Sequence, residues 1–220
     1  MELSYWESRW RKNNTGFHMP DGYPGLRKHW NSLGLPESPE VLVPLCGKTP
    51  DMSWMMAQGA VITGVEIAIK AIEEFFLENN LQFETDRFAS FNIYKAPDIT
   101  IWQGDFLKLP KQKLPEFDLI YDKAALVALP PEKRPAYAKK LMELCSNNTS
   151  ILLHHFIYNQ NEMAGPPFSV SIEEVEKTFA GRFRITCLEK NQLDLSKFEK
   201  FKIRGLSSGL TEQLLYLTPL

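Results

Sequence analysis

Short apolar runs alternate with longer amphipathic stretches along this chain of 220 residues. The apolar runs are bounded by turn residues, which is typical of buried strands, and the amphipathic stretches have helical spacing. Strands are expected at residues 41–45, 60–66, 91–94, 99–102, 117–121, 150–156, 183–188 and 213–217, and helices at 50–58, 68–79, 131–145 and 170–179. Strands that alternate with helices form βαβ units. The sequence therefore predicts an α/β fold with a mostly parallel sheet and helices on both faces.

The length and charge of the chain limit its class. This length fits one domain, and no Pro- or Gly-rich linker divides it. Lys and Arg number 25 against 27 Asp and Glu, so no broad cationic field draws the chain to nucleic acid or anionic lipid. No apolar run approaches the ~18 residues of a membrane span, and residues 1–7 do not resemble a signal peptide. Three cysteines without metal-ligand spacing indicate a reducing cytoplasm.

Gly47 lies in the turn that follows the first predicted strand. The carboxyl ends of parallel strands share one edge of a sheet, and ligands bind at that edge. A glycine there lets the backbone approach a ligand closely, although an ordinary tight turn explains it equally well. Neither the full G-x-G-x-x-G pattern nor a phosphate-loop pattern ending at Lys48 is present, so support for dinucleotide binding is weak.

Acidic residues follow the next two strands of the predicted edge. Glu66 ends the second strand, where an acid accepts two hydrogen bonds from a ribose diol; a helix N-cap or a surface ion pair is the alternative. Asp105 and Phe106 follow the strand at 99–102 and fit an adenine pocket, with a carboxylate for the exocyclic amine and a ring for the purine. An Asp at such a point is also often a helix cap.

Asp122 and Lys123 follow the strand at 117–121. Two interpretations stay open: a mutually neutralised surface pair, or two groups that face the ligand cleft.

Three aromatic residues precede the first strand. Trp6 and Trp10 are four residues apart on an expected helix and therefore share a face, and Phe17 follows them. Core packing is the commoner role of such residues. The alternative is a lid that places aromatic faces over a cationic ligand, where one contact contributes roughly 0.5–2 kcal/mol.

Two other patterns concern a metal site and the start of a helix. His154 and His155 are adjacent on a predicted strand, so they point to opposite faces and cannot bind one metal ion together. No zinc spacing or nucleophile elbow appears, and we expect no metal. Ser171 and Glu174 have the spacing of a capping box at the start of a helix.

Six segments of the chain together resemble the thiopurine S-methyltransferase family of S-adenosylmethionine (SAM)-dependent enzymes. They occur in the family's order and cover most of the chain, and the turn at 43–48 and the stretch at 121–130 are the most specific. The segments are YWESRW at 5–10, NTGFH at 14–18, VPLCGK at 43–48, GVE at 64–66, YDKAALVALP at 121–130 and GPPF at 165–168.

This resemblance implies a Rossmann-like class I methyltransferase fold with a seven-stranded sheet, an antiparallel hairpin at its end, and a single domain over residues 1–220 whose residues 1–35 form an N-terminal helical lid. The lid hypothesis makes Trp6 and Phe17 substrate-binding residues. The family usually has Arg at the position of Lys123, and Lys keeps the charge but loses the planar fork. The resemblance implies SAM contacts at Trp10, Leu45, Glu66, Asp105, Phe106 and Lys123.

The expected activity is methyl transfer from SAM to the sulfur of small aromatic or heterocyclic thiols. A role in detoxifying thiol, selenium or tellurium compounds comes from the resemblance alone. A sulfonium and a thiolate react to give neutral products, so catalysis needs alignment and exclusion of water. A general base is optional because aromatic thiols ionise readily, and we assign Lys123 the catalytic role of favouring the anionic nucleophile.

Further expectations concern partners and competing functions. The chain is expected to be a cytoplasmic monomer that binds a small-molecule thiol and neither nucleic acid nor membrane. The competing functions are a nicotinamide-dependent oxidoreductase, a nucleic-acid methyltransferase and a non-catalytic SAM-binding module. The sequence does not name the acceptor, which depends on the lid and on the loop at 159–168.

Overall fold

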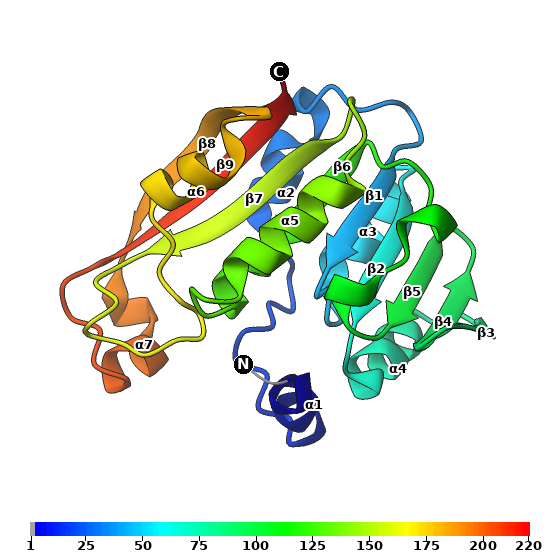
Figure 1. Ribbon diagram of the computed structural model, residues 1–220. Coiled ribbons are helices and arrows are strands. Elements are labelled where there is room, and N and C mark those ends of the chain that lie inside the picture. Colours follow the sequence, from blue (N-terminus) through cyan, green and yellow to red (C-terminus); the bar gives the residue numbers. More distant parts are fainter. Residues whose placement is uncertain (1–2) are drawn as a thin grey trace. The chain divides into compact units, whose positions relative to one another are not determined.

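The computed structural model describes residues 3–220, which form two compact units, one ending at Tyr121 and the other beginning at Asp122 (Figure 1). The single domain expected over residues 1–220 stays a prediction. Residues 3–220 contain nine strands, whereas the family resemblance implied seven. Six of these strands lie in the first unit, counting the strand that runs through the boundary, and three lie in the second.

The first unit is a sheet with a parallel centre. Its strands are ordered β3-β4-β5-β2-β1-β6. Parallel pairing joins β5, β2, β1 and β6, while β3, β4 and β5 are antiparallel. The elements are α1 (Leu3–Arg11), α2 (Pro24–His29), β1 (Glu40–Pro44), α3 (Pro50–Ala57), β2 (Val61–Glu66), α4 (Ile69–Glu78), β3 (Glu84–Phe88), β4 (Phe91–Ala96), β5 (Ile99–Gln103) and β6 (Leu119–Lys123).

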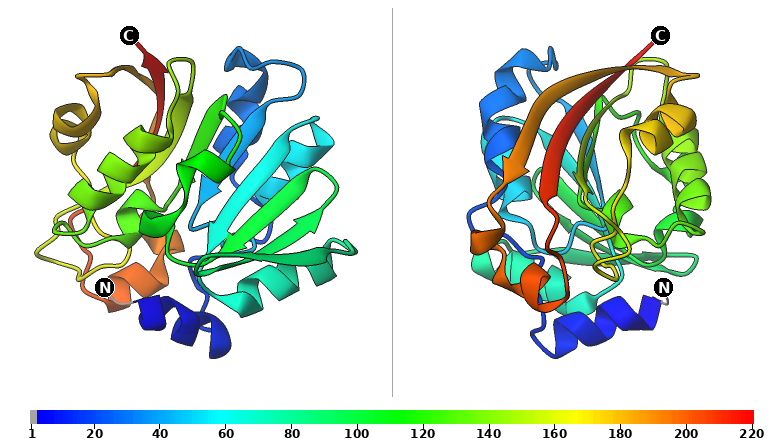
Figure 2. Two further views of the ribbon diagram at one scale, coloured as in Figure 1. Left: turned by 45° about the vertical axis from the view of Figure 1, so that its right-hand side comes forward. Right: turned by 90° about the vertical axis from the view of Figure 1, so that its left-hand side faces the viewer.

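The apolar pattern of the sequence explains the core of this unit. On α4 the side chains of Ile72, Phe75 and Phe76 are buried, and this helix packs against β2 and β5. On β1, Val41 and Leu42 are both 0% exposed, as expected for a strand covered on both faces. Helix α1 lies beside α4, as the views of Figure 2 also show.

The second unit is an antiparallel sheet with helices. Its strands are ordered β7-β9-β8, and the long strands β8 and β9 run side by side in Figure 2. Strand β8 has an irregular register between Cys187 and Glu189. The elements of this unit are α5 (Arg134–Leu144), β7 (Ser150–Ile157), α6 (Ile172–Phe179), β8 (Phe183–Leu193), α7 (Glu199–Ile203) and β9 (Leu210–Pro219).

The structure differs from the expected elements at several points. Strand β3 was not expected because its first four residues are polar and exposed and show no apolar alternation. Helix α5 begins at Arg134 rather than at residue 131, since the preceding residues form a turn. At the start of α6, Ser171 caps the N–H of Glu174 at 3.2 Å as predicted, but the carboxylate of Glu174 binds Arg134.

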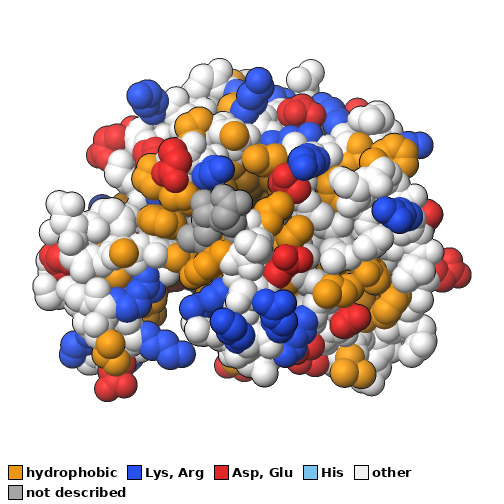
Figure 3. Space-filling model, turned by 60° about the horizontal axis from the view of Figure 1, so that its bottom comes forward, with side chains coloured by type: hydrophobic (Ala, Val, Ile, Leu, Met, Phe, Trp, Pro, Cys, Tyr) orange, Lys and Arg blue, Asp and Glu red, His pale blue; other side chains and the backbone are white. Residues whose placement is uncertain are grey.

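The surface carries both signs of charge. Acidic and basic side chains both appear on the face drawn in Figure 3, with hydrophobic side chains between them. Within residues 3–220, every helix is too short or too polar to cross a lipid bilayer.

Candidate functional site

The turn after β1 has a backbone shape that favours glycine. Leu45 and Gly47 both have positive φ angles, 48° and 55°. A Cβ atom on Gly47 would lie 2.9 Å from a ring carbon of Trp10, which is closer than side chains tolerate. Gly47 is therefore required both by the turn and by the indole that covers it.

Glu66 ties this turn to the end of β2. One carboxylate oxygen, Oε2, accepts the N–H of Gly47 at 2.8 Å. The other, Oε1, accepts the N–H groups of Ile67 at 2.9 Å and Ala68 at 2.8 Å, just before α4. The residue is only 5% exposed, which excludes the surface ion pair. The helix-cap alternative is correct in part, because Glu66 caps the chain leading into α4 and also binds the neighbouring turn.

The electrostatics of Glu66 suit a ligand that donates hydrogen bonds. Burial raises the pKa of its carboxyl above the usual range, although the three N–H groups oppose that effect. A carboxylate has about four acceptor positions, so one remains on Oε2 after these contacts. One hydroxyl group of a ligand such as a ribose could donate a hydrogen bond to this remaining position.

The end of β5 adjoins the same edge. The N–H of Gly104 donates to the carbonyl oxygen of Glu66 at 2.9 Å, which brings the loop carrying Asp105 and Phe106 next to β2. Asp105 accepts the N–H of Leu107 at 3.0 Å and caps a short 3-10 helix, so the cap alternative is observed. Phe106 is 3% exposed. Leu45, Glu66 and Asp105 thus follow three adjacent strands, and adenine recognition stays a prediction.

The N-terminal aromatic residues form a cluster of edge-to-face contacts. The rings of Trp6 and Phe17 are 5.4 Å apart, and those of Trp10 and Phe17 are 5.6 Å apart. Trp10 is buried in a small cluster with Ala68 and Ala71, whereas Phe17 is 38% exposed. Core packing therefore describes Trp10. The ring of Phe17 contacts both indoles but stays partly exposed to solvent.

In the second unit, Asp122 and Lys123 differ in their surroundings. Asp122 is 0% exposed, while Lys123 is half-buried at the end of β6. Asp122 accepts the N–H groups of Ala125 and Leu126, each at 3.0 Å, and the hydroxyl of Tyr137 at 2.9 Å. For Asp122 both interpretations are therefore wrong: its carboxylate is buried and caps its own turn, so it neither forms a surface pair nor faces a cleft.

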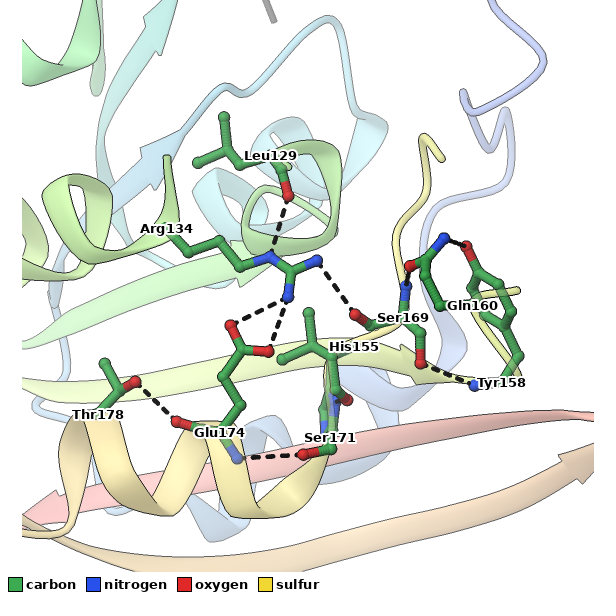
Figure 4. A network of polar contacts seen from close by, with 10 residues as sticks. Leu129, Arg134, His155, Tyr158, Gln160, Ser169, Ser171, Glu174 and Thr178 are labelled. Atoms are coloured by element: carbon green, nitrogen blue, oxygen red, sulfur yellow. Dashed lines mark hydrogen bonds and ion pairs between the residues drawn. The ribbon is translucent and has the colours of Figure 1, made fainter. Parts of the chain in front are cut away.

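Arg134 is buried, at 4% exposed. Its guanidinium contacts Leu129, Ser169 and Glu174, as Figure 4 shows, and so joins the two loops that flank this turn. Its Nε donates to the carbonyl oxygen of Leu129 at 3.0 Å, and its Nη2 to that of Ser169 at 3.1 Å. Its Nη1 lies 2.7 Å from Glu174 Oε2, and the guanidinium stands 5.9 Å from the centre of the Phe168 ring. The loop after β6 and the loop before α6 are thus held by one side chain.

The loop at 159–168 is also braced from within. The hydroxyl of Tyr158 donates to the carbonyl oxygen of Pro167 at 2.7 Å, and Gln160 Oε1 accepts the N–H of Ser169 at 2.8 Å. The N–H of Phe168 donates to the carbonyl oxygen of Val127 at 2.7 Å. These hydrogen bonds fix the conformation of the loop.

Sequence reasoning did not identify Arg134 or Tyr137, and it gave Asp122 no specific role. An arginine and a tyrosine near the start of a helix are ordinary on a surface, and nothing local marks them as buried. The only available signal was the position of Asp122 directly after an apolar strand, where a bare carboxylate is costly to bury.

The adjacent histidines have separate partners, as their alternation predicts. His154 Nε2 lies 2.7 Å from Glu212 Oε1, and His155 Nδ1 lies 2.9 Å from the carbonyl oxygen of Val170. Burial lowers the pKa of His155 to about 4.

Comparison with known sequences shows similarity along nearly the whole chain. A sequence model of the family described as Thiopurine S-methyltransferase (TPMT) matches residues 1–218. A thiopurine S-methyltransferase of Pseudomonas aeruginosa (strain LESB58) is 42% identical over 207 residues, covering 94% of each chain.

Comparison with solved structures shows the fold. A SAM-dependent methyltransferase from Anabaena variabilis ATCC 29413 has a TM-score of 0.65 at 12% identity, covering 99% of this chain and 95% of that one. The 1,6-didemethyltoxoflavin-N1-methyltransferase of Burkholderia thailandensis, solved with S-adenosylhomocysteine bound, has a TM-score of 0.61 at 14% identity, covering 98% and 87%. The predicted Rossmann-like class I methyltransferase fold is confirmed, with nine strands in the described residues in place of seven.

Proposed function

Because the chain belongs to the thiopurine S-methyltransferase family, we propose that it transfers the methyl group of SAM to the sulfur of small aromatic or heterocyclic thiols. SAM-dependent methylation follows from the family. The thiol acceptor, the individual roles of the site residues, the monomeric state and the cytoplasmic location belong to the proposal, as does any activity on selenium or tellurium compounds.

The observation that carries the cofactor side is the buried carboxylate of Glu66 bound to the N–H of Gly47 at 2.8 Å. We assign the adenosyl group of SAM to Leu45, Glu66 and Asp105, with its ribose at Glu66 and its adenine at Asp105 and Phe106. Trp10 covers the turn and limits the access of water. When bound, SAM supplies an electrophilic methyl group on a sulfonium.

The acceptor side is assigned to the aromatic lid and to Lys123. Phe17 is partly exposed beside Trp6, and such faces suit an aromatic acceptor. A nearby ammonium lowers the pKa of a thiol and so raises the fraction of thiolate, which is the nucleophilic form. Lys123 would therefore hold the acceptor as an anion while the lid excludes water.

The decisive experiment is a panel of thiols assayed with SAM labelled on its methyl group. We expect label in the methyl thioether of aromatic and heterocyclic thiols, and little in aliphatic thiols of higher pKa. A selenol and a tellurite sample added to the panel test the wider acceptor range. SAM binding without turnover on any acceptor would favour a binding module, and binding of NAD in its place would favour an oxidoreductase.

Lys123→Met tests the catalytic assignment on the same panel. We expect a lower kcat, with the largest loss for acceptors whose thiol pKa lies above the assay pH. Lys139→Met removes the same charge from an exposed position on α5 and serves as the control. Unchanged kinetics of Lys123→Met across pH would remove Lys123 from the mechanism.

A further inference from the structure

The turn that carries Lys123 contains a backbone angle that alanine rarely adopts. Ala124 has a φ of +61°, in the left-handed region, and it follows Lys123 directly at the end of β6. A residue with a Cβ atom is strained there and keeps this conformation only when its surroundings enforce it. Something on either side of Ala124 must therefore hold the turn.

Asp122 supplies that restraint from the N-terminal side. Its Oδ1 accepts the N–H groups of Ala125 and Leu126, both at 3.0 Å, and so spans Ala124. Its Oδ2 accepts the hydroxyl of Tyr137 at 2.9 Å, which ties the turn to α5. Both Asp122 and Tyr137 are buried, at 0% and 1% exposed. The strained residue is thus enclosed by three hydrogen bonds that converge on one carboxylate.

The direction of Lys123 follows from this arrangement. Successive side chains of a strand point to opposite faces, so a carboxylate fixed on one face of β6 sets the face that the next side chain takes. The strained turn at Ala124 then fixes where the strand stops and where the Lys123 side chain emerges.

We propose that Asp122 is a positioning residue for methyl transfer: with Tyr137 it holds the left-handed turn at Ala124 and thereby aims the Lys123 ammonium at the acceptor. This inference rests on the role proposed above for Lys123. Asp122 itself does not touch the acceptor, because it is fully buried.

A double-mutant cycle tests this inference with the full-length protein and an aromatic thiol. The variants are Asp122→Ala, Lys123→Met and the combination of both. We expect Asp122→Ala to lower kcat about tenfold or more, since small displacements of a catalytic group have effects of that size. Asp122→Ala should change neither kcat nor the Michaelis constant for SAM any further when Lys123 is already Met. An equal loss of kcat in both backgrounds would overturn the inference.

Rescue by a conservative variant separates aiming from a charge effect. The amide of Asn keeps an oxygen for the N–H groups of Ala125 and Leu126 and offers its NH2 group to the oxygen of Tyr137. We therefore expect Asp122→Asn to restore kcat to within about threefold of the parent. Asp98→Asn changes an exposed carboxylate in the same way and serves as the control. A loss in Asp122→Asn as deep as in Asp122→Ala would contradict the positioning role.

Two further variants keep the test decisive if Asp122→Ala does not fold. Tyr137→Phe removes one of the three hydrogen bonds, and Ala124→Gly relaxes the strained turn without removing a polar group. We expect Ala124→Gly to lower kcat while the protein stays as stable as the parent, or more so. Parent-like kcat in both variants would overturn the inference, whereas a parent that methylates no thiol would overturn the proposed function itself.

Discussion

Glu66 and Asp122 are both buried carboxylates at the carboxyl end of a β-strand, and each accepts three hydrogen bonds. Their partners differ. Glu66 binds Gly47, which belongs to the turn after another strand, as well as its own two following residues. Asp122 binds its own turn and the hydroxyl of Tyr137.

Because of this difference, Glu66 can contact a ligand, whereas Asp122 can only hold the turn that follows it. Glu66 keeps 5% of its surface exposed and one acceptor position on Oε2, the oxygen that binds the N–H of Gly47. Asp122 is 0% exposed. Its Oδ1 accepts two backbone N–H groups, and its Oδ2 accepts the hydroxyl of Tyr137. An acid after a buried strand is therefore not by itself a ligand contact, because its partners decide the role.

Among the predicted effects, the loss of SAM affinity on removal of the Glu66 carboxylate is the largest. Glu66→Ala removes the acceptor for a ribose diol, and hydrogen bonds to a charged group contribute about 1.5–3 kcal/mol each. We expect the Kd for SAM to rise about 10- to 150-fold by calorimetry, with Glu66→Gln intermediate. Glu176→Ala on the exposed face of α6 is the control. Parent-like SAM binding by Glu66→Ala would refute the assigned contact.

Arg134 tests whether the second unit can be perturbed without loss of SAM binding. Arg134→Met leaves the carbonyl groups of Leu129 and Ser169 without their donor and breaks the pair with Glu174. We expect the free energy of unfolding to fall by about 3 kcal/mol in urea, mainly because two carbonyl oxygens lose their donor; the lost pair adds less, since the Glu174 side chain is 38% exposed.

Arg134→Met should also change the choice of acceptor. Below its unfolding transition, Arg134→Met should bind SAM as the parent does but discriminate less between large and small thiols. Arg184→Met removes an exposed arginine of β8 and should change neither property. A SAM affinity that falls together with stability would contradict the separation of the two sides.

The pH dependence of stability gives a third way to test Asp122. Burial raises the pKa of Asp122 to about 6, above the ~3.9 of an unfolded Asp. Its contribution to stability is therefore fully present below about pH 4 and is lost as the pH rises through about 6. We expect the parent to gain stability relative to Asp122→Asn as the pH falls from 6 to 4, measured as the difference between their urea midpoints.

In the same unit, His155 has the opposite effect on the pH dependence of stability. Its pKa is lowered to about 4 by burial, so its contribution is present above the unfolded pKa of ~6.5 and is lost as the pH falls through about 4. Between about pH 4 and 6.5, a falling pH raises the free energy of unfolding through Asp122 and lowers it through His155. Asp122→Asn removes the first effect, so its free energy of unfolding should fall more steeply with falling pH than that of the parent. An identical pH slope in parent and Asp122→Asn would show that this carboxyl titrates normally.

The smallest effect concerns the turn beneath Trp10. Gly47→Ala and Gly34→Ala place a Cβ atom at similar positive φ angles, +55° and +67°, but only the first would meet the indole, at 2.9 Å. Both should lose about 1 kcal/mol of stability from backbone strain. Gly47→Ala alone should also weaken SAM binding several-fold, and equal binding by the two variants would remove Trp10 from the cofactor side.

Much of the architecture was predictable because it depends on local patterns. The strand at 60–66 and the helix at 68–79 appear as Val61–Glu66 and Ile69–Glu78, since apolar periodicity reflects which residues can be buried. Strand β3 was missed because an exposed edge strand needs no apolar face: it is held to β4 by the backbone ladder and by an exposed ion pair between Asp86 and Lys95, and neither gives an apolar pattern.

For the candidate site, the residue types that follow β1, β2, β5 and β6 could be read from the chain, as could the family to which it belongs. Which atoms those residues bind could not. The contact of Glu66 with Gly47 spans 19 residues, and that of Arg134 with Glu174 spans 40, so neither leaves a periodic trace. A buried polar group is satisfied by whichever donor or acceptor the folded loops bring within about 3 Å. That choice exists only once the packing of the whole unit has placed the loops.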